Sequence, residues 1–100
     1  MNTGIKFDEL EDILVEDEVT SGMKSQLIVY NDDYNTFDWV IQCLMEVCNH
    51  TQEQSEQLSI LVHFKGKATV KTGTMTLLKP MKDALIERGL SAVIESLVED

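Results

Sequence analysis

Three adjacent polar residues, Asn31, Asp32 and Asp33, follow a strand-like apolar run and precede a helical pattern. Their amide and carboxylate oxygens are suited either to a calcium ion or to a group with several N–H donors. An EF-hand calcium loop beginning at Asn31 would need glycine at its sixth position and a bidentate glutamate at its twelfth. The sequence has Thr36 and Gln42 at these positions. The sequence therefore does not predict a calcium loop. A group with several N–H donors remains as a ligand for these three residues.

The composition indicates one acidic domain. One hundred residues, 43% of them hydrophobic, are enough for a single folded core. The formal net charge of −10 disfavours nucleic acid as a partner, because binding to phosphates depends on basic side chains. Basic protein surfaces and cationic ligands remain as electrostatically suitable partners.

Much of the negative charge lies at the N-terminus. Residues 1–24 carry seven acids against Lys6 and Lys24. This charge density predicts a mobile acidic N-terminal arm, followed by a folded domain over residues 25–100. The arm also contains the apolar residues Leu10, Ile13 and Leu14, which would share one face if this part formed a helix.

The sequence predicts neither a metal site nor a thiol enzyme. Cys43 and Cys48 are five residues apart, which is neither a metal-ligand nor a redox spacing, so they are expected to be packing residues in a reducing compartment. Cys48 with His63 would supply part of a thiol hydrolase, but Cys48 falls within an apolar helical stripe. His50 is not spaced with these residues as a metal ligand would be. With no apolar run of membrane-spanning length and no leader pattern, we expect a cytoplasmic protein without a membrane partner.

Hydrophobic periodicity predicts the fold class α/β, a single small α/β sandwich of order β-α-α-β-α-β. The predicted sheet is three-stranded and antiparallel, with three helices packed on it. Asn35 is expected as the N-cap of the first helix, Thr51 and Gln54 as a capping box of the second, and Pro80 places the regular part of the third helix near Lys79. The predicted strands cover residues 25–30, 67–71 and 91–97, and the predicted helices cover residues 36–48, 51–66 and 79–89, with a loop over residues 72–76.

Two separated motifs resemble the ClpS adaptor family of bacterial regulated proteolysis. The family pattern has Asn-Asp-Asp-Tyr-Thr-Pro-Met between a hydrophobic strand and a hydrophobic helix, and later Val-His-(Tyr/Phe)-x-Gly-Lys-Ala. This sequence has YNDDYNTFDWV at residues 30–40 and LVHFKGKA at residues 61–68. The resemblance extends over roughly residues 26–97.

The resemblance implies an adaptor and not an enzyme, with no cofactor. Family members recognise N-degron substrates, which are proteins whose first residue is Leu, Phe, Tyr or Trp. They deliver these substrates to a Clp-family AAA+ unfoldase, ClpA or a relative, which works with the ClpP peptidase.

The same resemblance assigns residues to an amine site. The positions that match the family's α-amino-binding positions are Asn31, Asp32, Asp33 and His63. A charged amine has three N–H donors and needs such converging acceptors. The sequence leaves open which of the two aspartates contacts the amine directly.

The resemblance also assigns a side-chain pocket and a docking surface. The matching pocket positions are Asn35, Phe37, Val40, Ser59 and Val62. Three of them depart from the common family pattern, which has Thr for Asn35, Met for Phe37 and a second Met for Ser59. The expected unfoldase-docking positions are Thr76 and Met81, where the family often carries Glu and Lys.

Each assignment has a plain structural alternative. Asn and Asp after a strand are ordinary turn residues, and a histidine such as His63 near the end of a helix is stabilised by the helix dipole. Phe37 and Val40 fit a helical core pattern. The alternative function is a protein-interaction module of the same fold without an N-terminal-residue pocket.

Overall fold

The structure is a computed structural model that describes residues 24–97. Residues 1–23 and 98–100 lie outside this range, and with them almost all of the predicted arm over residues 1–24. The elements are β1 (Ser25–Tyr30), α2 (Phe37–Cys48), α3 (Gln52–Lys65), β2 (Lys67–Gly73), α4 (Met75–Glu87) and β3 (Ser91–Ser96).

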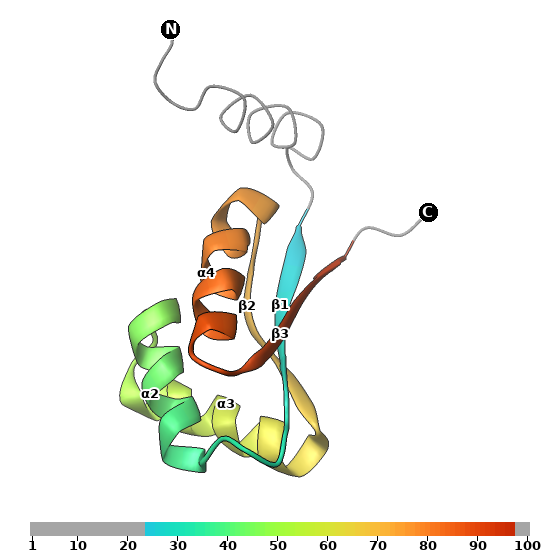
Figure 1. Cartoon of the computed structure of the whole chain (residues 1–100). Coiled ribbons are helices and arrows are strands. Elements are labelled where there is room, and N and C mark those ends of the chain that lie inside the picture. Colours follow the sequence, from blue (N-terminus) through green and yellow to red (C-terminus); the bar gives the residue numbers. More distant parts are fainter. Residues whose placement is uncertain (1–23, 98–100) are drawn as a thin grey trace, which may run out of the picture.

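The three strands form one antiparallel sheet in the order β2-β1-β3, with the helices on one face and the other face open (Figure 1). The predicted fold class and element order are confirmed. β1 is the central strand, and the register pairs its last residue, Tyr30, with Lys67 of β2 and Ser91 of β3. The end of β1 therefore lies beside the first residues of both neighbouring strands, and so beside the turns that precede them.

The core lies between the sheet and the helices. Leu27 and Val29 of β1 belong to it, because alternate residues of a strand point to the same face of the sheet. The residues from the helices that meet them with exposures of 3% or less include Cys43, Leu44, Cys48, Val62, Leu78 and Leu85. The two cysteines are free thiols and packing residues, as predicted.

The N-cap of α2 is Thr36 and not Asn35, which corrects the sequence prediction. The Thr36 hydroxyl accepts a hydrogen bond from the backbone N–H of Trp39 at 3.0 Å. Asn35 does not cap the helix because its side chain is bound to other groups of the chain, which are described below. The capping box of Thr51 and Gln54 is present at the start of α3 as predicted.

The start of α4 also differs from the prediction. β2 extends to Gly73 and α4 begins at Met75, so the expected loop is reduced to a single cap residue. The hydroxyl of Thr74 accepts a hydrogen bond from the backbone N–H three residues later at 3.3 Å. Pro80 lies inside the helix, where it removes one backbone hydrogen bond. The cap and the complete burial of Leu78 in the first turn outweigh this loss.

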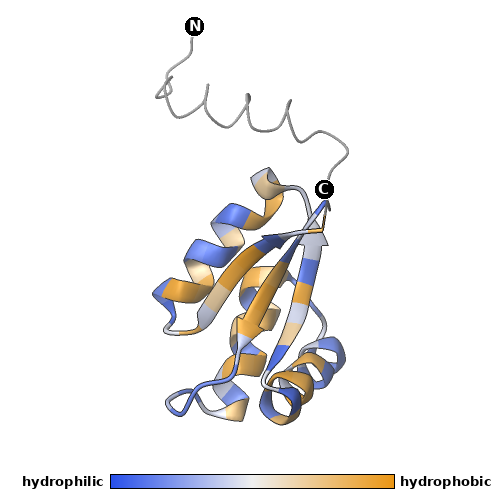
Figure 2. Ribbon diagram, turned by 90° about the vertical axis from the view of Figure 1, so that its right-hand side faces the viewer, coloured by the Kyte–Doolittle hydropathy of each residue, from blue (hydrophilic) through white to orange (hydrophobic). Residues whose placement is uncertain are grey.

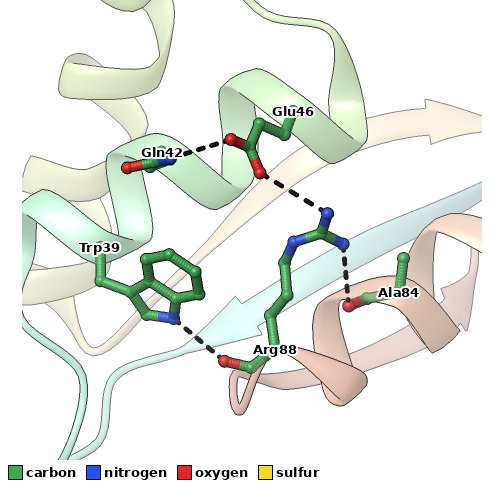
Figure 3. Close-up of polar contacts among 5 residues, drawn as sticks. All are labelled: Trp39, Gln42, Glu46, Ala84 and Arg88. Atoms are coloured by element: carbon green, nitrogen blue, oxygen red, sulfur yellow. Dashed lines mark hydrogen bonds and ion pairs between the residues drawn. The ribbon is translucent and has the colours of Figure 1, made fainter.

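Polar contacts of Arg88, the C-cap residue of α4, join α4 to α2 (Figure 3). The indole N–H of Trp39 donates to the carbonyl of Arg88 at 3.0 Å, and the guanidinium pairs with Glu46 at 3.5 Å. The same guanidinium donates to the carbonyl of Ala84, and Gln42 donates to the other oxygen of Glu46. These contacts, made by Trp39 near the start of α2 and Glu46 near its end, hold the helix against the turn between α4 and β3.

The burial pattern predicts how two leucine substitutions differ in stability. We expect Leu44→Ala to lower the free energy of unfolding by about 2–5 kcal/mol, because it removes a fully buried side chain and leaves a cavity. Leu77→Ala is the matched control, since Leu77 is also helical but 43% exposed, and we expect a change within about 0.5 kcal/mol. Urea unfolding measured by circular dichroism tests the difference, and equal losses would contradict the assigned core.

Candidate functional site

A polar loop over residues 31–36 connects β1 to α2 at one end of the sheet (Figures 1 and 2). On one side, the backbone N–H of Asn31 donates to the carbonyl of Gly66 at 2.9 Å. On the other side, the side-chain amide of Asn35 donates to the carbonyl of Gly89 at 2.9 Å. Gly66 and Gly89 have φ values of 92° and 93°, a region that favours glycine, and they form the turns after α3 and α4. The loop is thus attached to both turns that precede its neighbouring strands.

Asp32 holds the loop together from within. One oxygen of its carboxylate accepts from the backbone N–H groups of Tyr34 and Asn35, both at 2.8 Å, and the other accepts from the Asn35 amide at 2.7 Å. Partial burial opposes ionisation of Asp32, but these three hydrogen bonds outweigh it and lower the pKa of the carboxyl group below its ordinary value. Asp32 is therefore a charged loop-organising residue, and the same contacts orient Asn35 toward Gly89.

Three other polar side chains at this end of the molecule are unpaired within the part of the chain that the structure describes. Asn31, Asp33 and His63 are exposed, and none of their side chains has a hydrogen bond or an ion pair within residues 24–97. His63 lies in the last turn of α3, and the C-cap of this helix is Gly66, whose carbonyl accepts the hydrogen bond from the Asn31 backbone. The ring of His63 packs edge-on against Phe64, with ring centroids 5.0 Å apart.

This arrangement is suited to a positively charged donor. Asn31 offers an amide oxygen, Asp33 a carboxylate and neutral His63 one ring nitrogen as acceptors. The C-terminal end of a helix carries partial negative charge, so the end of α3 favours a cation in the same place. The charged Asp32 in the loop adds to this field.

The residues expected to form the side-chain pocket differ in their exposure. Val40, Ser59 and Val62 are buried, with exposures of 9%, 2% and 3%, on α2 and α3, which pack against each other. Phe37 begins α2 and is 42% exposed. Asn35 is half-buried, and its side-chain amide donates hydrogen bonds to Asp32 and to the carbonyl of Gly89.

Comparison with known proteins identifies the family. The family described as "ATP-dependent Clp protease adaptor protein ClpS" matches residues 20–93. The chain belongs to the ClpS family. This family consists of protease adaptors and not of catalytic proteins, which agrees with the expectation from the sequence.

Curated ClpS proteins are about one-third identical to this chain over the stretches that align. The ClpS protein of Nitratidesulfovibrio vulgaris Miyazaki F is 34% identical over 55 residues, which are 55% of either chain. That of Thermosynechococcus vestitus is 36% identical over 67 residues, or 66% of this chain and 71% of the relative. That of Escherichia coli O1:K1 is 33% identical over 67 residues, or 67% and 63%. The chain spans about half the length of the Nitratidesulfovibrio relatives.

A solved structure supports the fold. Agrobacterium tumefaciens ClpS2 bound to L-phenylalaninamide aligns with a TM-score of 0.63 and 22% identity, covering 74% of this chain and 96% of that one. The ClpS fold is therefore shown for this chain by its architecture as well as by its sequence.

The two positions expected to dock the unfoldase do not form one surface. Thr76 is exposed in the first turn of α4, whereas Met81 is half-buried and packs against the core. Residues five apart on a helix point about 140° away from each other, because each residue turns the helix by about 100°. Docking through both positions stays a prediction from the resemblance, and the structure presents only Thr76 openly.

The metal-site and thiol candidates differ in exposure: both cysteines are buried, His50 is half-buried and His63 is exposed. Within residues 24–97, no group of three or more His, Cys, Asp and Glu side chains could hold a metal ion. Burial raises the pKa of the Cys43 thiol to about 11 and also raises that of Cys48. Both sulfurs are therefore protonated at neutral pH and unsuited to nucleophilic attack.

None of the helices described is long and apolar enough to cross a bilayer.

Two exposed aromatic residues beside the polar site were not assigned a role from the sequence. Tyr34 is 91% exposed at the tip of the loop, and Phe64 is 77% exposed next to His63. Large aromatic side chains are usually more buried, and when exposed near polar acceptors they often contact a ligand. The signal in the sequence was the aromatic residue within the polar stretch over residues 31–36.

The different surroundings of Asp32 and Asp33 predict a pH-dependent difference in stability. We expect Asp32→Asn to lower the free energy of unfolding at pH 7 by about 1–2 kcal/mol, because the new amide would face the Asn35 amide donor. The pKa of Asp32 is lowered by folding, so its contribution is complete above the ordinary value of 3.8 and is lost as the pH falls through the lower folded value. The loss caused by Asp32→Asn should therefore shrink in acid.

Asp33→Asn is the matched control for this measurement. Its carboxylate accepts no hydrogen bond within residues 24–97, so we expect little change in stability at either pH. Urea unfolding at neutral and acidic pH compares the two variants. If both lower the stability equally, the loop is not organised by Asp32.

Proposed function

We propose that the chain is an adaptor for N-degron substrates, acting in the cytoplasm. It binds the free α-amino group and the large hydrophobic first side chain of proteins that begin with Leu, Phe, Tyr or Trp. It then presents them to a Clp-family AAA+ unfoldase, ClpA or a relative, that works with ClpP. Membership of the ClpS family supports the adaptor role. The observation that carries substrate recognition is the set of unpaired acceptors at the junction of the loop and α3.

The α-amino group is held by Asn31, Asp33 and His63. Each can accept one of the three N–H donors, and the carboxylate of Asp33 supplies the compensating charge. Asp32 acts on the amine through its field and through the loop geometry that it maintains, since its own oxygens already accept three hydrogen bonds. An internal peptide has no such cation and would leave the three acceptors without a partner.

The first side chain of the substrate enters beside Phe37. This ring lies at the start of α2, directly after the loop, and its exposed part forms the outer wall. Val40, Ser59 and Val62 lie behind it between α2 and α3. L-Phenylalaninamide, to which the Agrobacterium ClpS2 is bound, combines a free α-amino group with an aromatic side chain and has the chemistry proposed for the ligand here.

Binding of substrates is expected to require the free amine. A fluorescent peptide that begins with Phe should bind, and its N-acetylated form should not, because acetylation removes the charge that Asp33 pairs with. We expect Asp33→Asn to weaken binding of the free peptide tenfold or more, since 1.4 kcal/mol corresponds to tenfold. The same variant should slow degradation of a Phe-initiated reporter by a ClpA-type unfoldase with ClpP.

Asp83→Asn is the control, because Asp83 is an exposed carboxylate on α4, away from the loop. It should leave the peptide affinity unchanged. Equal binding of free and acetylated peptides in a fluorescence-polarisation titration would refute the amine site. It would favour the alternative of a general protein-interaction module, with Tyr34 and Phe64 as its exposed aromatic contacts.

The pocket wall at Phe37 predicts selectivity for the first residue. A stiff ring beside the substrate should exclude side chains that branch at Cβ, so we expect Phe37→Ala to admit peptides beginning with Ile or Val. Ile86→Ala, on α4 and similarly exposed, is the control and should not change the order of preference. Competition titrations with peptides that differ in their first residue measure this order. An unchanged order in Phe37→Ala would remove Phe37 from the pocket.

A further inference from the structure

A groove between α4 and the edge strand β3 lies away from the polar loop. It has a volume of about 360 Å³ and is lined by Met75, Lys79, Lys82, Ala92, Val93 and Ile94. The three residues from α4 form one stripe of the helix, because they are four and three positions apart. Val93 is 39% exposed, so the groove has an open apolar rim. Nothing in the proposed function uses this surface.

The charge of the groove is positive. Its two charged lining residues are Lys79 and Lys82, and it contains no acidic side chain. Lys82 has one weak ion pair with its neighbour Asp83 at 3.4 Å, which stabilises little because both groups are partly exposed. Three further grooves on the described surface each include at least one carboxylate, from Glu53, from Asp38 with Glu46 and Glu56, or from Glu95. Of these four grooves, this one alone has two lysines and no carboxylate in its lining, in a chain whose net charge is −10.

The same chain contains a segment with the opposite charge and matching apolar residues. Residues 9–16 read ELEDILVE and consist of four acids and four apolar residues, with no base. They lie outside residues 20–93, the range matched by the ClpS family, so the family match does not account for them.

The segment is tethered close to the groove. The backbone carbonyl of Lys24 accepts a hydrogen bond from Leu97 at 2.9 Å, so the described chain begins beside the end of β3. Ile94, in the groove, is three strand residues from Leu97, which corresponds to about 10 Å. The seven residues between position 16 and Lys24 can span up to about 25 Å. Residues 9–16 can therefore reach the groove without strain.

We propose that residues 9–16 bind in the α4–β3 groove of their own chain. Their apolar side chains contact Met75, Val93 and Ile94, and their carboxylates lie beside Lys79 and Lys82. The short tether gives the segment a high effective concentration at the groove, so modest contacts are sufficient to hold it there. The opposite charges make the contact sensitive to salt.

Paramagnetic relaxation tests the contact in the full chain. Lys6→Cys introduces a thiol just before the segment, and a nitroxide reagent will react there selectively, because Cys43 and Cys48 are buried and their pKa values are raised. In the ¹⁵N-labelled protein, we expect the amide signals of Lys79, Lys82, Val93 and Ile94 to be lost with the oxidised label and regained on its reduction. An unbound tether would spread the effect over the residues near Lys24.

Charge reversal supplies the matched comparison. Lys79→Glu combined with Lys82→Glu should restore the lost signals, whereas Lys65→Glu combined with Lys67→Glu, at the opposite end of the sheet, should not. If the substitutions at Lys79 and Lys82 disturb folding, 0.5 M salt can be added to the labelled protein without them. The Debye length then falls to about 4 Å, which weakens the attraction between the opposite charges, so the signals should also return. Signal loss that is confined to residues near Lys24, or that survives both treatments, would overturn the proposal. So would loss that is seen only when labelled and ¹⁵N chains are mixed, because the segment would then come from another copy.

Discussion

Both oxygens of the Asp32 carboxylate accept hydrogen bonds from within the loop over residues 31–36, and the Asn35 amide that Asp32 orients reaches the carbonyl of Gly89. With the Asn31 bond to Gly66, these contacts attach the loop to the turns on both sides of β1. The candidate site depends on this constraint. An unattached loop would present its polar side chains in many orientations, and ordering them on binding would cost conformational entropy.

Because of these loop contacts, neighbouring residues of similar chemistry have different roles. Asp32 and Asn35 use their polar atoms inside the protein, which leaves Asn31 and Asp33 free to accept hydrogen bonds from outside. The loop carries two adjacent carboxylates, Asp32 and Asp33. The charge of Asp32 is stabilised by backbone N–H groups of the loop itself. The Arg88 contacts with Trp39 and Glu46 hold α2 against the same turn that receives Asn35, so the helix packing and the loop support each other (Figure 3).

The departures from the common ClpS pattern lie in two parts of the fold. The expected pocket positions Phe37 and Ser59 lie on α2 and α3, and the Met that the family pattern has at each is here a rigid ring and a small hydroxyl. Within residues 24–97, the buried hydroxyls of Ser59 and of Ser55, one turn earlier, have no hydrogen-bond partner. On α4, Met81 packs against the core and has no charge. The proposed ligand site and the proposed unfoldase contacts thus each include a position that departs from the family pattern.

Local signals in the sequence were sufficient to determine the element order, β1, the capping box of α3 and the glycine turn at Gly66, because alternation, side-chain caps and positive φ act within a few residues. The family, too, was evident from two short motifs. Only the tertiary structure decided that Thr36 and not Asn35 caps α2, because Asn35 is bound to Gly89, 54 positions away. It also decided that α4 begins before Pro80, since burial of Leu78 against the sheet outweighs the local cost of proline. The separate roles of Asp32 and Asp33 were likewise invisible in the sequence, because identical side chains differ only in the donors that the folded loop places around them.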